Sequence, residues 1–128
     1  MRLHVAAVPV LLLTSASGIA ADMLPLVQGI YVEVGTPCKG ASDAATMSYW
    51  GGNNGINVQQ IGCEINTLTR EGSSYSLQRT CTSGRFGGSF EDRVKVTIFN
   101  RTSFTFHGRA SLGMQDRRFR YCGPKVQL

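Results

Sequence analysis

Four cysteines, spread from position 38 to position 122 of a 128-residue chain, constrain the fold more than any other feature. They are Cys38, Cys63, Cys81 and Cys122, an even set that contains no CxxC pair. The missing CxxC spacing disfavours a zinc knuckle or a redox pair. In an oxidising compartment, an even set is typical of two disulfides that staple a small domain. The sequence therefore predicts a disulfide-stabilised domain that needs no metal or other cofactor.

The first 21 residues are typical of a secretory signal peptide. A short start with a positive charge at Arg2 precedes an apolar run from Val5 to Leu13, and mostly small residues follow as far as Ala21. This order of segments marks export signals. The apolar run is shorter than the ~20 residues that a membrane-spanning helix needs, and no later stretch qualifies. We therefore expect removal of residues 1–21, and a secreted or periplasmic protein in which residues 22–128 form one domain.

Alternating apolar and polar residues predict an all-β domain. Val94, Val96 and Ile98 alternate with charged or polar residues, and other segments follow the same rule. Alternation with a period of two marks a strand with one buried face. Only residues 43–49 are also compatible with a short helical turn. The pattern predicts seven or eight antiparallel strands in a small β-barrel or a tightly rolled sandwich.

The parity of the apolar residues indicates how the cysteines pair. On two consecutive predicted strands the apolar residues are odd-numbered, so a three-residue loop, Glu71-Gly72-Ser73, places Cys63 opposite Cys81. Directly opposed residues lie ~4.5–5.5 Å apart at Cα, which is within disulfide range. Four cysteines allow three pairings, and this register favours Cys63–Cys81. The remaining pair, Cys38–Cys122, then joins the first strand's exit loop to the last strand.

The next hairpin follows the same rule. A register that places Ile98 opposite Phe104 requires a three-residue loop, residues 100–102. That register also places Lys95 opposite His107 on the outer face of the sheet.

Positive charge is concentrated in the second half of the expected domain. Residues 22–78 contain two lysines and arginines against five acids, whereas residues 79–128 contain ten against three. Strand alternation directs part of this charge to one outer face. We predict a non-enzymatic exported binding module that recognises an anionic surface, polymer or protein there, although an ordinary solvated surface is the favoured interpretation of the charge alone. The residues expected on this face are Arg93, Lys95, His107, Arg118 and Arg120.

An alternative prediction is binding of a protein partner through aromatic residues at loop tips. Trp50 precedes a glycine-rich run at residues 51–55, and Phe86 lies within another at residues 84–88. Aromatic residues on loops often make recognition contacts, although a core position is the favoured interpretation of Trp50. These loops predict a protein-binding or inhibitor module.

The expected architecture resembles small exported barrels such as the lipocalin-like binders and the periplasmic inhibitors of lysozyme. The turn Glu71-Gly72-Ser73-Ser74-Tyr75 resembles the Ser-Gly-rich loop of the inhibitors. No motif matches either family residue by residue, so the resemblance concerns architecture only.

Catalysis and nucleic-acid binding find less support. His107 is the one histidine of residues 22–128, and the adjacent Glu91 and Asp92 point to opposite faces of a strand. An enzyme would need one of these carboxylates beside His107 in a pocket. Nucleic-acid binding would need Phe119 and Tyr121 exposed for base stacking, whereas alternation places both in the core.

Overall fold

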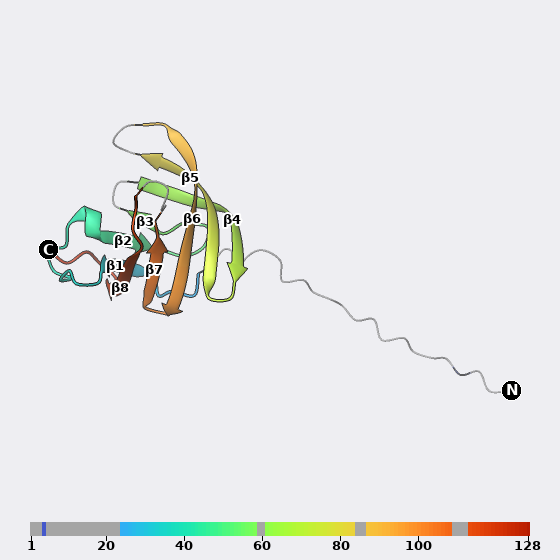
Figure 1. The fold of residues 1–128 in the computed structure, drawn as a ribbon, viewed down its shortest axis with the longest axis horizontal. Helices are drawn as coiled ribbons and strands as arrows, with labels where there is room; N and C mark the ends of the chain where they lie inside the picture. The colour runs from blue at the N-terminus through green and yellow to red at the C-terminus, as the bar shows by residue number, and fades with distance from the viewer. Residues whose placement is uncertain (1–3, 5–23, 59–60, 84–86, 109–112) are drawn as a thin grey trace.

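The computed structural model describes His4 and residues 24–58, 61–83, 87–108 and 113–128. Within these residues, eight antiparallel strands form one sheet that rolls into a nearly closed barrel (Figure 1). The strand order in the sheet is β3-β2-β1-β8-β7-β6-β5-β4. The predicted all-β fold is confirmed, and the barrel is the form that it takes. The strands are β1 (Gly29–Glu33), β2 (Thr46–Tyr49), β3 (Asn57–Val58), β4 (Ile61–Glu71), β5 (Ser74–Ser83), β6 (Ser89–Asn100), β7 (Ser103–His107) and β8 (Arg117–Gly123).

Helix among the described residues is limited to one short turn. A 3-10 turn spans Asp43–Ala45, and β2 begins directly after it. The segment 43–49, which the sequence left open as a helical turn, is therefore mostly strand. The described residues include no helix with the length and apolar character needed to cross a membrane. The expected signal segment, residues 1–21, lies outside the described residues except for His4.

Aromatic side chains fill the inner face of the barrel. Tyr31, Phe104 and Phe119 are completely buried and come from β1, β7 and β8. The Phe104 ring centroid lies 5.2 Å from that of Tyr31 and 5.3 Å from that of Phe119. Tyr121, on the same face of β8, contacts the Tyr31 ring at 5.5 Å. The cluster ties the first strand to the last two, as expected for aromatic residues that alternation places in the core.

The predicted three-residue loops were wrong in both long hairpins, and the strand registers were right only beyond a bulge in each, where Cys63 pairs with Cys81 and Ile98 with Phe104. In the β4–β5 hairpin Glu71 pairs with Ser74, so the turn holds two residues, and a bulge at Asn66 then shifts the register by one. In the β6–β7 hairpin the turn holds residues 101–102, and the bulge lies at Phe99. A bulge adds one residue to its strand. That residue replaces the third loop residue and keeps the apolar side chains on the inner face.

Both predicted disulfides are present. Cys63 and Cys81 are direct partners across β4 and β5, 18 residues apart in the sequence. Cys38 in the loop after β1 is bonded to Cys122 in β8, 84 residues away. The two bonds are consistent with an oxidising, extracellular environment.

The barrel closes where the segment before β3 meets β4. The Gly55 amide donates to the Cys63 carbonyl at 2.9 Å, and the Ile65 amide donates to the Asn53 carbonyl at 2.7 Å. The Cys63 amide donates to the side-chain oxygen of Asn57 at 3.0 Å. Individual bonds from an irregular segment, rather than a long ladder, therefore join the two end strands of the sheet.

Removal of the two disulfides should cost different amounts of stability. A longer cross-linked loop restricts the unfolded chain more strongly. Alanine at positions 38 and 122 should therefore lower the free energy of unfolding by ~4.5 kcal/mol, against ~3 kcal/mol for alanine at positions 63 and 81. Urea denaturation of the two double variants measures this difference. Equal losses, or a larger loss for the shorter loop, would contradict loop entropy as the main source of stabilisation.

Candidate functional site

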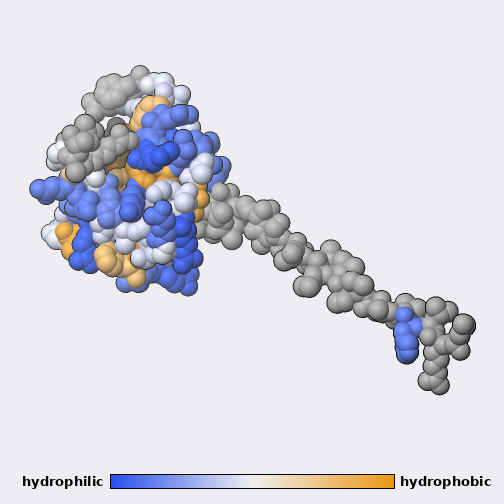
Figure 2. Space-filling view, turned by 45° about the vertical axis from the view of Figure 1, so that its right-hand side comes forward, coloured by the Kyte–Doolittle hydropathy of each residue, from blue (hydrophilic) through white to orange (hydrophobic). Residues whose placement is uncertain are grey.

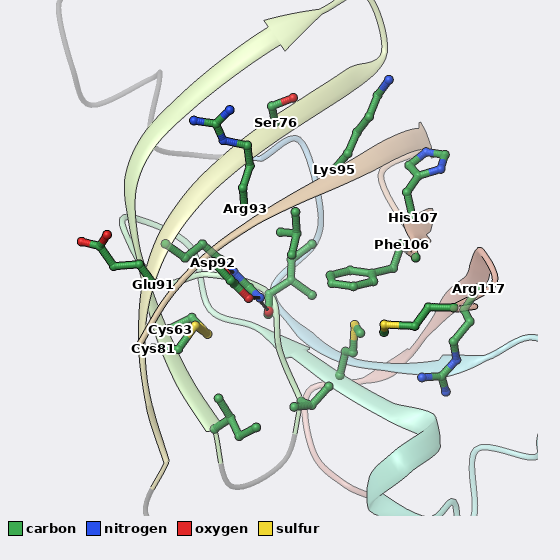
Figure 3. Close-up of a pocket in the computed structure, with 18 of the residues that line it drawn as sticks. Cys63, Ser76, Cys81, Glu91, Asp92, Arg93, Lys95, Phe106, His107 and Arg117 are labelled. Atoms are coloured by element: carbon green, nitrogen blue, oxygen red, sulfur yellow. Dashed lines mark hydrogen bonds and ion pairs between the residues drawn. A yellow bond between two sulfur atoms is a disulfide. The ribbon is translucent and has the colours of Figure 1, made fainter. Parts of the chain in front are cut away.

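Four basic side chains lie on the outer side of three neighbouring strands, β6, β7 and β8. Val96 of β6 is completely buried, so the odd-numbered residues on either side of it point outward. Lys95 pairs with His107, as the sequence predicted. Figure 3 shows Lys95 and Arg93 projecting from β6 on the same side. The set consists of Arg93, Lys95, His107 and Arg118, and we call it the basic face.

Arg118 is oriented by an exposed aromatic ring that the sequence reasoning did not select. Its guanidinium carbon lies 4.9 Å from the centroid of Phe99. Phe99 is the bulged residue of β6, and it is 56% exposed. Attraction between the cation and the ring fixes the guanidinium plane, whose N–H edges then remain available to an anion. The sequence signal for Phe99 was an aromatic residue at a position where alternation predicts a polar, outward-facing one.

Arg120, the fifth residue expected on this face, directs its guanidinium at backbone carbonyls. Nη1 donates to the carbonyls of Val32 at 3.4 Å and Glu33 at 3.1 Å. Nη2 donates to the carbonyl of Thr36 at 2.7 Å. These bonds hold the chain where it leaves β1, so we do not include Arg120 in the basic face.

His107 belongs to a chain of polar side chains that crosses several strands. Its Nε2 lies 2.6 Å from Thr97 Oγ1, and its Nδ1 lies 2.9 Å from Asp116 Oδ2. Thr97 Oγ1 also contacts Ser74 Oγ at 2.9 Å. The Gly108 amide donates to Asp116 Oδ1 at 3.1 Å. The chain therefore links β5, β6 and β7 to the segment that precedes β8.

The carboxylate beside His107 differs from those that the sequence offered. Asp116 supplies it, whereas Asp92 pairs with Arg79 and Glu91 is exposed on β6. Sequence reasoning missed Asp116 because it lies outside any strand pattern, and only the fold brings it to β7.

A carboxylate that orients an imidazole beside a hydroxyl resembles the arrangement that activates a nucleophile. Here the hydroxyl belongs to Thr97, whose residue pairs with β5 on one side and with β7 on the other. Acyl transfer also needs donors directed at the developing oxyanion. The backbone beside Thr97 is committed to the sheet instead. The polar chain is best explained as a support for the His107 ring and for the segment around Asp116.

The barrel contains an open cavity of about 760 Å³. Side chains on the inner face of the sheet form most of its wall, and Figure 3 shows Phe106 directed into it. Figure 2 shows apolar surface recessed in the middle of one face of the molecule, surrounded by hydrophilic residues. The apolar lining comprises Met47, Ile56, Val58, Ile61, Phe90, Val94, Phe106 and Met114, with the Cys63–Cys81 disulfide beside them.

A buried ion pair crosses the cavity wall. Arg79 is 6% exposed and donates from Nε and Nη2 to the two carboxylate oxygens of Asp92, at 2.8 Å and 2.7 Å. Its Nη1 donates to the carbonyl of Ile56 at 2.7 Å. A buried guanidinium is tolerated only when its donors are satisfied. Among the described residues, no buried side-chain nitrogen or oxygen lacks a hydrogen-bond partner.

Of the two aromatic residues predicted at loop tips, the structure describes Trp50 but not Phe86. Trp50 is 46% exposed, so its interpretation as a core residue was wrong, and it is not part of the cavity lining. Trp50 directly follows β2 and precedes a turn, so no strand among the described residues covers its side chain. Phe86 lies outside the described residues. In the part of the chain that the structure describes, no group of three His, Cys, Asp or Glu side chains is placed to hold a metal ion.

Comparison of the chain with protein-family models, with curated proteins and with solved structures found no match. The geometry of the basic face and of the cavity therefore carries the functional proposals.

Loss of Asp92 should destabilise the barrel more than loss of the whole ion pair. Asp92→Ala leaves the Arg79 charge buried with one carbonyl acceptor, which should lower the free energy of unfolding by ~3–5 kcal/mol. The double variant Arg79→Met, Asp92→Ala removes the charge as well and should regain part of that loss. Chemical denaturation of both variants tests this order. A double variant less stable than Asp92→Ala would show that the buried charge is not the main cost.

The hydrogen bond from His107 lowers the pKa of Asp116 below its ordinary value of 3.8. A carboxyl group with a lowered pKa stabilises the folded state while it is ionised. Its contribution is therefore present at neutral pH and disappears as the pH falls through the lowered value. An NMR titration of the Asp116 carboxyl carbon should show the lowered pKa, and His107→Ala should raise it. The same pKa in both proteins would mean that the contact is absent in solution.

Proposed function

We propose that this protein is a non-enzymatic binding module that recognises an anionic surface, polymer or protein through its basic face. The proposal is carried by the shared outer side of β6, β7 and β8, which presents the four basic residues together. Adjacent strands lie ~4.8 Å apart, and successive outward residues of one strand lie ~6.6 Å apart. Spacings of this size suit the closely spaced charges of a polyanion better than a single small anion.

Lys95 and Arg118 are expected to supply most of the attraction. Both are exposed, and Arg118 is held in a fixed orientation by Phe99. His107 contributes less, because Asp116 offsets its charge when the imidazole is protonated. A guanidinium presents paired donors to sulfate, phosphate or carboxylate oxygens, whereas an ammonium acts as a point charge.

We further infer that the protein works outside the cytoplasm, in a secreted or periplasmic location, after removal of residues 1–21. The two disulfides support this location, because reducing compartments keep thiols unpaired.

The exposure of Trp50 favours a second candidate, a protein-binding or inhibitor module that acts through loop tips. The residue is 46% exposed beside the turn at residues 51–54. A large aromatic side chain in such a place is a common anchor at protein interfaces. Binding to a polyanion should survive Trp50→Ala under the first candidate, whereas capture of a protein partner should not under the second.

The protein should bind a sulfated polysaccharide such as heparin, and the affinity should fall steeply as salt is added. Lys95→Ala combined with Arg118→Ala should weaken binding at low ionic strength about thirtyfold, because each lost charge removes ~1 kcal/mol of attraction. Calorimetric titrations at low and at physiological ionic strength measure both effects.

A matched control removes the same net charge elsewhere. Lys39 and Lys125 are exposed and lie outside β6, β7 and β8, so alanine at both positions should leave heparin binding close to that of the unmodified protein. If both double variants lost the same heparin affinity, net charge alone would explain the effect. Affinity that does not respond to salt, or no binding at all, would exclude the basic face as the site.

A further inference from the structure

Strand β6 presents two different surfaces. Its odd-numbered residues Arg93 and Lys95 belong to the basic face, whereas Val94 and Asp92 face the interior. Figure 3 shows Lys95 and Arg93 directed away from the cavity and Phe106 directed into it. A molecule inside the barrel therefore meets mainly the inward set of side chains, which is apolar.

The cavity has the size of a small-molecule site. Its volume of about 760 Å³ lies within the ~300–1,000 Å³ that is usual for ligand pockets. The wall draws on distant parts of the sequence, with Val58 from β3, Val94 from β6 and Phe106 from β7. Because these strands are fixed by the sheet, the cavity is part of the folded barrel rather than a gap in a loop.

Two arginines of the cavity wall, Arg79 and Arg117, are already paired within the protein. Arg79 is bound to Asp92 and to a backbone carbonyl. Arg117 donates from Nε to Glu33 at 2.9 Å and from Nη2 to the carbonyl of Ala44 at 2.7 Å. An ion that entered would lose its hydration without gaining a free partner from either arginine. Because Arg93 and Lys95, which also border the cavity, are directed away from it (Figure 3), the inward part of the wall favours an uncharged occupant.

Apolar side chains remain exposed at the mouth. Phe90, the second residue of β6, is 46% exposed although it faces the inner side of the sheet. Met114 is 53% exposed. The C-terminal end of β5 and the N-terminal end of β6 project beyond the rest of the barrel, which explains the exposure of Phe90 (Figure 1). A ligand that reached the mouth would cover both side chains, and a methionine adapts readily to different shapes.

We propose that the barrel cavity binds an uncharged, mainly apolar small molecule. The cavity and the basic face share strand β6, and Arg93, Lys95 and His107 border both, but the two sites differ in the chemistry of the occupant that they favour. It does not depend on the anionic partner proposed above.

N-Phenyl-1-naphthylamine is a suitable probe, because it is uncharged at neutral pH and fluoresces more strongly in apolar surroundings. The oxidised protein should bind it saturably, with an affinity that does not fall as salt is added. The double variant Val58→Trp, Val94→Trp fills the cavity from two walls and should weaken binding at least about tenfold by excluding the probe. Valines 34 and 126 are exposed and outside the cavity, so tryptophan at both positions is the matched control and should change nothing.

Two further variants keep the test decisive. If the filled variant does not fold, Phe90→Ser removes an exposed apolar contact at the mouth and should weaken probe binding about fivefold. Arg118 belongs to the basic face and does not line the cavity, so Arg118→Ala should bind the probe like the unmodified protein, which separates this site from the basic face. Absence of saturable binding, or binding unaffected by both Phe90→Ser and the filled variant, would overturn the proposal. So would displacement of the probe only by peptides, because the occupant would then be a protein segment.

Discussion

The buried guanidinium of Arg79 joins two paired strands of the sheet to the irregular segment that closes the barrel. Its paired bonds to Asp92 connect β5 to β6, and its remaining bond reaches Ile56 in the segment that closes the barrel. Movement of that segment away from β4 would leave a donor of the buried guanidinium without its acceptor, which is costly. The same bonds neutralise the charge in the cavity wall. Arg79 therefore contributes both to barrel closure and to the charge balance of the cavity wall.

Much of the fold follows from alternation in the sequence, because alternation records which face of a strand is buried. The all-β class, the disulfide between Cys63 and Cys81 and the pairing of Lys95 with His107 were all predictable in this way. The turns were not. A three-residue loop and a two-residue turn followed by a bulge place the distant residues in the same register, so parity cannot distinguish them. The bulges at Asn66 and Phe99 became visible only in the structure.

In the candidate sites too, residues within regular strands were predictable and contacts made by irregular segments were not. Alternation was enough to place Arg93, Lys95 and Arg118 on one outer side, because all of them lie within regular strands. It could not identify Asp116, which reaches His107 from an irregular segment, or the cavity, whose walls come from strands far apart in the sequence. The carbonyls that engage Arg120 belong to the chain leaving β1, so that contact also depends on tertiary structure.

The order of the cysteines has a consequence for how the protein matures. The bond between Cys63 and Cys81 is nested inside the one between Cys38 and Cys122. A chain that emerges from its N-terminus exposes Cys38, Cys63 and Cys81 before Cys122. The partner of Cys38 is therefore the last thiol to appear, and any earlier bond of Cys38 has to be released by thiol–disulfide exchange. Correct oxidation can finish only after Cys122 has emerged, so a mispaired Cys38 is the species on which an isomerase would act.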